Sequence, residues 1–174
     1  MATVVFVPAA QVEALSITPA TTAVATGDDT SQAVINTLIA PIIAPAVEVY
    51  KENVGQADEG TLASSYETEY FNSADDPEDA TITYVGGDIV GPTAYLLVKD
   101  GNSSPAWYLF NLTGLGWDGM DTLMLTDFWI GRGAISHVAL FGSATSVPEP
   151  ATLSLLAFGL LGVGAVRRRR SQVA

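Results

Sequence analysis

The fold is decided by residues 80–113, which read ATITYVGGDIVGPTAYLLVKDGNSSPAWYLFNLT. β-Branched and aromatic residues cluster in short segments here and in the 28 residues that follow, and turns rich in glycine, proline, asparagine and aspartate separate them. Five such segments are ATITYV (80–85), TAYLLVK (93–99), AWYLFNLT (106–113), DTLML (121–125) and AISHVALF (134–141). Short strands at regular spacing, with no helix between them, predict an all-β fold: an antiparallel, jelly-roll-like β-sandwich.

One short helix is predicted upstream of these strands. It follows a polar loop at 27–29, where Thr30 or Ser31 suits an N-cap. Pro41 and Pro45 should end it. Its apolar positions fall at helical spacing and are Val34, Ile35, Leu38 and Ile39.

Two more strand-like segments follow the helix, VEVY at 47–50 and YETEYF at 66–71. The second alternates, so Tyr66, Thr68 and Tyr70 should share one face, while Glu67, Glu69 and Phe71 share the other.

The charge of the chain is divided unevenly. The 174 residues have a net charge of −12, a mean hydropathy of +0.31 and no cysteine. Residues 1–147 hold eighteen acids and three bases, whereas the last 27 residues hold four arginines and one glutamate. A body at −15 repels phosphate backbones, so we expect no nucleic-acid partner. The absence of cysteine excludes disulfides, zinc–thiolate sites and thiol catalysis.

The C-terminal segment predicts a single transmembrane helix. Residues 151–166 read ATLSLLAFGLLGVGAV, carry no charge, and precede four arginines, Arg167, Arg168, Arg169 and Arg170. As a helix the span is about 24 Å long, slightly less than a hydrocarbon core of about 30 Å. The arginines should remain cytoplasmic and place the body outside the cytoplasm. The alternative is a buried core helix, but such a helix rarely ends in four arginines.

Pro148-Glu149-Pro150, followed by this Leu/Gly/Ala-rich span and the arginines, resembles the PEP-CTERM sorting signal of Gram-negative bacteria. The resemblance implies that an exosortase, an integral-membrane cysteine transpeptidase-like enzyme, recognises the signal and removes the tail. It further implies transient anchoring in the inner membrane, delivery to the cell surface or extracellular matrix, and an association with exopolysaccharide and biofilm. On this interpretation Glu149 is a recognition determinant rather than a catalyst.

The body shows a second likeness. Residues 95–142 are similar to the bodies of many PEP-CTERM proteins, in which a string of K-D-G, W-Y, W-D-G and S-H-V recurs. This likeness supports the β-sandwich and brings no activity with it. The chain is thus expected to comprise residues 1–14, a β-sandwich ectodomain at 15–146 and a sorting signal at 147–174. Residues 1–14 are either the remnant of a truncated signal peptide or, at 2–7, a first strand.

Residues 58–79 contain eight acids and no base. Within them, Asp75, Asp76, Glu78 and Asp79 offer several carboxylates in one short loop, a set suited to calcium. They lack the spacing of an EF-hand, and the alternative is a solvated acidic loop. No other cofactor is expected.

Two further motifs have structural interpretations. Residues 114–119 fit G-x-G-x-x-G, but no strand–helix unit surrounds them, so we expect a turn with Trp117 packed over the sandwich. His137, the single histidine, is expected to pack or to make a structural hydrogen bond, because no partner for a metal or a catalytic triad accompanies it.

The sequence therefore favours a non-enzymatic protein of the exopolysaccharide matrix. One alternative is a carbohydrate-binding module, for which Trp107, Trp117 and Trp129 are the candidate sugar-stacking residues. A polysaccharide hydrolase is the other, since paired carboxylates can cleave glycosides, but no pair stands out.

Overall fold

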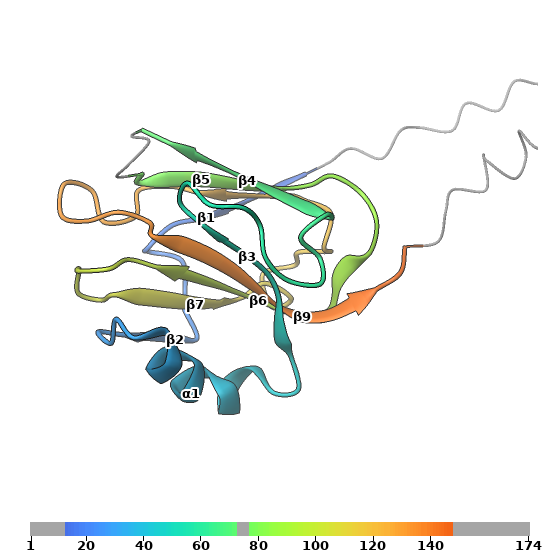
Figure 1. Ribbon diagram of the computed structural model, residues 1–174, viewed down its shortest axis with the longest axis horizontal. Helices are drawn as coiled ribbons and strands as arrows, with labels where there is room; N and C mark the ends of the chain where they lie inside the picture. The colour runs from blue at the N-terminus through green and yellow to red at the C-terminus, as the bar shows by residue number, and fades with distance from the viewer. Residues whose placement is uncertain (1–12, 73–76, 148–174) are drawn as a thin grey trace, which may run out of the picture.

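The computed structural model describes residues 13–72 and 77–147, which form two β-sheets and one helix (Figure 1). The elements are β1 (Ala14–Ile17), β2 (Ala25–Gly27), α1 (Gln32–Ile43), β3 (Val47–Asn53), β4 (Tyr66–Phe71), β5 (Asp79–Tyr84), β6 (Ile89–Lys99), β7 (Trp107–Asn111), β8 (Thr122–Leu125) and β9 (His137–Thr145). Each of the five segments predicted between residues 80 and 141 is confirmed as a strand.

The first sheet has the order β1-β8-β5-β4 and the second β2-β7-β6-β9-β3. All pairings are antiparallel except that of β1 with β8, where Ala14 lies opposite Thr122 and Ile17 opposite Leu125. The expectation of a wholly antiparallel sandwich is therefore wrong at this edge. A parallel pair needs a long connection, and more than a hundred residues separate β1 from β8.

The main core lies between the two sheets. Alternate residues of β6, β7 and β9 meet those of β4, β5 and β8, so that Leu96, Phe110, Leu140, Tyr66, Ile82 and Leu123 are all fully buried or nearly so. This shared core is consistent with a β-sandwich. It also confirms the alternation predicted for 66–71, because Tyr66 and Thr68 face inward while Glu67 and Glu69 are exposed.

α1 covers the outer face of the second sheet and makes a third layer (Figure 1). Ile35, Ile39 and Ile43 pack against the sheet residues Leu97, Leu109, Ala139 and Phe141. Ser31, one of the two predicted candidates, occupies the N-cap position, but its side chain makes no capping hydrogen bond. Pro41 does not end the helix, which continues to Ile43; its ring lies on the exposed side, where a missing backbone donor is tolerated. Of the four predicted apolar positions, Val34 and Leu38 are exposed, at 40% and 46%.

Two strands were missed by the sequence patterns, β1 and β2, because ALSI and ATG are short and mostly small residues. The predicted transmembrane helix at 151–166 and the alternatives for residues 2–7 lie outside the described residues. Among the residues that the structure does describe, no helix is both long and apolar enough to span a bilayer.

Candidate functional site

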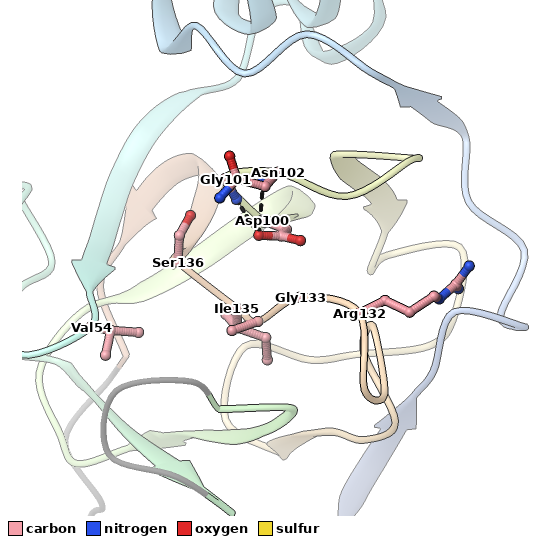
Figure 2. A pocket seen from close by; sticks show the side chains of 9 residues that line it. Val54, Asp100, Gly101, Asn102, Arg132, Gly133, Ile135 and Ser136 are labelled. Carbon is pink, nitrogen blue, oxygen red and sulfur yellow. Dashed lines mark hydrogen bonds between the residues drawn. The ribbon is translucent and has the colours of Figure 1, made fainter.

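A pocket of about 460 Å³ lies at the end of the second sheet, where three loops meet. One loop follows β3, one follows β6 and one precedes β9. Figure 2 shows its lining, Val54, Asp100, Gly101, Asn102, Arg132, Gly133, Ala134, Ile135 and Ser136. Two parts of the recurring string, Lys99–Gly101 and Ser136–Val138, therefore meet at this pocket.

Asp100 organises the loop after β6. Its Oδ1 accepts hydrogen bonds from the backbone N–H groups of Gly101 and Asn102. Its Oδ2 is buried without a partner, and it lies against Gly133, where a Cβ atom would overlap it. Arg132 does not neutralise this carboxylate, because its side chain points away from Asp100 (Figure 2). The pocket thus contains a carboxylate with one uncommitted acceptor oxygen.

Ser136 has a structural role at the same pocket. Its N–H donates to the carbonyl of Lys99 at 2.7 Å and its hydroxyl donates to the same oxygen at 3.0 Å. The hydroxyl is therefore committed to a backbone acceptor, and no base in the described lining activates it as a nucleophile.

A row of paired residues crosses the second sheet beside this pocket. Asn53, His137, Lys99, Trp107 and Gly27 lie opposite one another in adjacent strands, from β3 to β2. Residues directly opposite in antiparallel strands project from the same face, so the recurring string supplies three neighbours in this row. Lys99 is 7% exposed and its Nζ donates to the carbonyl of Asp100 at 3.0 Å.

Burial controls the ionisation of this row. The pKa of His137 is lowered to about 3, first by burial and then by the positive charges of Lys51 and Lys99. Burial also lowers the pKa of Lys99, although Asp100 opposes this effect. His137 is 6% exposed and its Nε2 has no hydrogen-bond partner, so it packs as a neutral ring. The packing role expected for His137 is confirmed.

A carboxyl pair lies beside β3, where side chains of β3 contact those of β4. The Tyr50 hydroxyl is 3.2 Å from Glu52 Oε2, 3.1 Å from Asp58 Oδ1 and 2.7 Å from Thr68 Oγ1. The Tyr70 hydroxyl donates to the Glu52 carbonyl at 3.1 Å. Sequence patterns missed this cluster. The sequence of β3, VEVYKEN, shows only that Tyr50 and Glu52 share one face of the strand. Asp58 belongs to a loop, and its place beside them is not visible in the sequence.

Burial is the main influence on the ionisation of this pair. The pKa of Glu52 is raised to about 7, mainly by burial and then by its hydrogen bond with Asp58 and the charge of Asp58. Its hydrogen bonds with Thr68 and Tyr50 oppose this shift. Burial likewise raises the pKa of Tyr50 and of Tyr70.

The loop expected to bind calcium is only partly described. Asp75 and Asp76 lie outside the described residues. Glu78 Oε1 accepts from the Gly131 N–H at 2.7 Å, and Asp79 accepts from the Asp127 N–H at 2.8 Å and from Asn72 Nδ2 at 2.6 Å. Glu78 and Asp79 thus anchor the loop between β8 and β9. No group of three or more potential metal-ligating acids or histidines is found in residues 13–72 and 77–147.

The three tryptophans are core residues. Trp107, Trp117 and Trp129 are 2%, 6% and 3% exposed. Trp117 Nε1 donates to the Asp121 carbonyl and Trp129 Nε1 to the Pro105 carbonyl, both at 2.7 Å. The expectation that they form a sugar-stacking surface is therefore wrong for the structure described, since stacking needs an exposed ring face.

Residues 114–119 form a turn, as expected. Gly116 and Gly119 have φ values of +88° and +92°, which favour glycine, and the Gly119 carbonyl accepts from the Tyr66 hydroxyl at 2.8 Å. This turn anchors the β7–β8 connection to the core. It joins two strands, whereas a dinucleotide-binding motif joins a strand to a helix.

The C-terminal candidates adjoin the fold directly. β9 ends at Thr145, and only Ser146 and Val147 follow it within the described residues. Pro148, Glu149, Pro150 and the arginines Arg167–Arg170 lie outside them.

Comparison with protein families supplies the remaining observation. Residues 146–170 match the model of the PEP-CTERM protein-sorting motif. Searches of curated proteins and of solved structures gave no match to the chain.

Proposed function

We propose that the PEP-CTERM sorting motif matched at residues 146–170 directs export of this chain through a membrane-anchored stage that an exosortase processes. The β-sandwich body is then a non-enzymatic component of the cell surface or extracellular matrix, associated with exopolysaccharide. Nucleic acid has no place in this function, because the body has a net charge of −15.

The observation that carries the proposal is the position of the signal. The motif begins at residue 146, immediately after the last strand ends at Thr145. All the strands that the structure describes, and both hydrophobic clusters of the described residues, precede it. Removal of the signal thus takes none of these strands from the body, and a folded, strongly acidic domain is the product.

The recognition step is tested by changing Pro148, Glu149 and Pro150 to alanine. We expect the full-length precursor to accumulate in the membrane fraction, because the enzyme-facing segment is lost. The matched control is Ser143→Ala with Thr145→Ala, two exposed positions of β9 that lie outside the matched motif. Immunoblots of membrane and culture fractions, with intact-mass measurement of the released protein, give the readout. Normal release of the triple-alanine variant would overturn the role of the motif.

A carbohydrate-binding module is the second candidate, and the pocket at Asp100 favours it. A volume of about 460 Å³ is within the range of small-ligand sites, and the lining includes the polar side chains of Asp100, Asn102 and Arg132, which suit sugar hydroxyls. The hydrolase alternative has less support, because both carboxyl groups of the described pair, Glu52 and Asp58, are hydrogen-bonded to the Tyr50 hydroxyl.

Association with polysaccharide is measured by co-sedimentation of the released protein with the producer's own exopolysaccharide, with calcium and with a chelator. We expect retention, and Asp100→Asn should lower it if the pocket holds the sugar. Asp118→Asn is the control, since Asp118 also caps a turn through its Oδ1 but is exposed and lies outside the pocket. No retention in either condition would overturn the matrix association. Equal retention of both variants would leave the association and exclude the pocket.

A further inference from the structure

The outward side of α1 carries an unusual number of exposed aliphatic side chains. Val34, Leu38 and Ile42 are 40%, 46% and 39% exposed. They repeat every four residues, so they form one continuous ridge along the helix. These side chains add nothing to the contact between α1 and the sheet, which Ile35, Ile39 and Ile43 make.

An apolar groove lies along the other flank of the same helix. It has a volume of about 400 Å³ and lies between α1, the segment 44–48 and the second sheet. Asn36 and Ala40 form its wall on the helix, Val47 lies at its edge with 61% exposure, and Phe141 forms its floor. Glu48 is the one charged residue in the lining, and burial raises the pKa of its carboxyl.

Charge limits what this surface can approach. The sequence of α1, QAVINTLIAPII, contains no charged residue, whereas the body as a whole carries −15. Two copies of the acidic body repel each other in most orientations, and this repulsion is weakest where uncharged surfaces meet. An aliphatic ridge and an apolar groove of the same chain are also chemically complementary.

We propose that copies of this protein associate head to tail, the ridge Val34–Leu38–Ile42 of one copy seated in the groove beside Ala40 of the next. Successive residues of a helix are about 100° apart, so Leu38 and Ala40 project about 160° from each other. One partner therefore cannot cover both surfaces. A contact between two different patches is heterologous and propagates instead of closing as a dimer.

The size of the surface sets the strength of the contact. α1 is about 18 Å long and about 10 Å wide, much less than the roughly 800 Å² per partner that stable complexes bury. The association is consequently weak in dilute solution and grows with local concentration. It also strengthens as salt rises, because about 1 M salt shortens the Debye length to about 3 Å and screens the repulsion between acidic bodies.

The test is sedimentation velocity on the released protein over a concentration series at low and high salt. We expect the weight-average sedimentation coefficient to rise with concentration, more so at high salt. Leu38→Gln removes the ridge and Ala40→Gln fills the groove, so each variant alone should remain monomeric. Thr37→Gln is the control, because Thr37 is exposed on the same helix but belongs to neither surface. Circular dichroism melts establish that all three variants are folded.

Mixing the two variants separates this arrangement from others. Leu38→Gln retains a groove and Ala40→Gln retains a ridge, so an equimolar mixture should form dimers and no larger species. A mixture that stays monomeric would overturn the head-to-tail contact. A native protein that stays monomeric under all conditions would also overturn the proposal, whether or not it binds lipid vesicles through α1. Association of Leu38→Gln to the same extent as the native protein would overturn it as well.

Discussion

Two side chains with opposite proton linkage stand out at the scale of single residues, Glu52 and His137. The pKa of Glu52 is raised from 4.5 to about 7, and that of His137 is lowered from 6.5 to about 3. Both are therefore neutral in the folded protein over much of the range between pH 4.5 and 6.5. The unfolded chain releases a proton from Glu52 and binds one at His137 over this range, so their effects on stability partly cancel.

Glu52→Gln should flatten the loss of stability on the alkaline side. A carboxyl whose pKa is raised on folding favours the folded state below its unfolded pKa, and this contribution is lost as pH rises from about 4.5 through about 7. In the native protein we expect the melting temperature to fall across this window through Glu52, and in the variant this part of the slope should vanish. Glu69→Gln, on an exposed face of β4, is the control. An unchanged slope in Glu52→Gln would contradict the raised pKa of Glu52 in the folded protein.

His137→Gln should reduce the loss of stability that occurs as the pH falls. A histidine whose pKa is lowered on folding contributes stability above its unfolded pKa of 6.5, and this is lost as pH falls toward about 3. Denaturant unfolding at a series of pH values measures how the free energy of unfolding changes with pH. The reference is the double variant that carries both His137→Gln and Glu52→Gln. If the acid slope persists without the imidazole, the buried neutral ring is not its source.

At the scale of elements, α1 contributes to the fold through one side only. Ile39 is 1% exposed against the second sheet, whereas Leu38 is 46% exposed. Ile39→Ala should lower the free energy of unfolding by about 2–5 kcal/mol, since it leaves a cavity between helix and sheet. Leu38→Ala should change it by at most about 0.5 kcal/mol. Chemical denaturation of both variants checks this difference, and similar losses at the two positions would contradict the one-sided packing of the helix.

Elements also show what the sequence could and could not reveal. β5 to β9 were predictable because they contain β-branched and aromatic residues and are separated by glycine-rich turns. β1 was not, because its place depends on β8 as a neighbour and not on its own short sequence. Pro41 was misread for a related reason: a proline on the exposed side of a packed helix is tolerated when tertiary contacts hold the turns around it.

The candidate sites follow the same division. His137 could be assigned to packing because the absence of partners is visible in sequence. The burial of Trp107 could not, since strand alternation does not say that α1 covers the outer face of the second sheet. The Tyr50, Glu52 and Asp58 cluster was hidden as well, because its third member comes from a loop that only the fold brings back to β3.

At the scale of the whole molecule, the body is expected to be independent of its signal. Both clusters of the core are formed before residue 146. The released protein should therefore melt at the same temperature as the full-length precursor held in detergent, within the error of a circular dichroism melt. A markedly lower melting temperature after release would show that the segment beyond β9 stabilises the body.

β9 is the strand that continues into the signal, and it has eight paired positions with β6 and six with β3. In mechanical terms, a membrane-held precursor is pulled through this strand. Tension at the tether loads hydrogen-bond ladders on two sides at once, because β9 lies between β6 and β3, instead of peeling an edge strand. β9 thus resists extraction from the sheet. A pulling force on the body outside the cell would be transmitted to the tether before the sandwich unfolds.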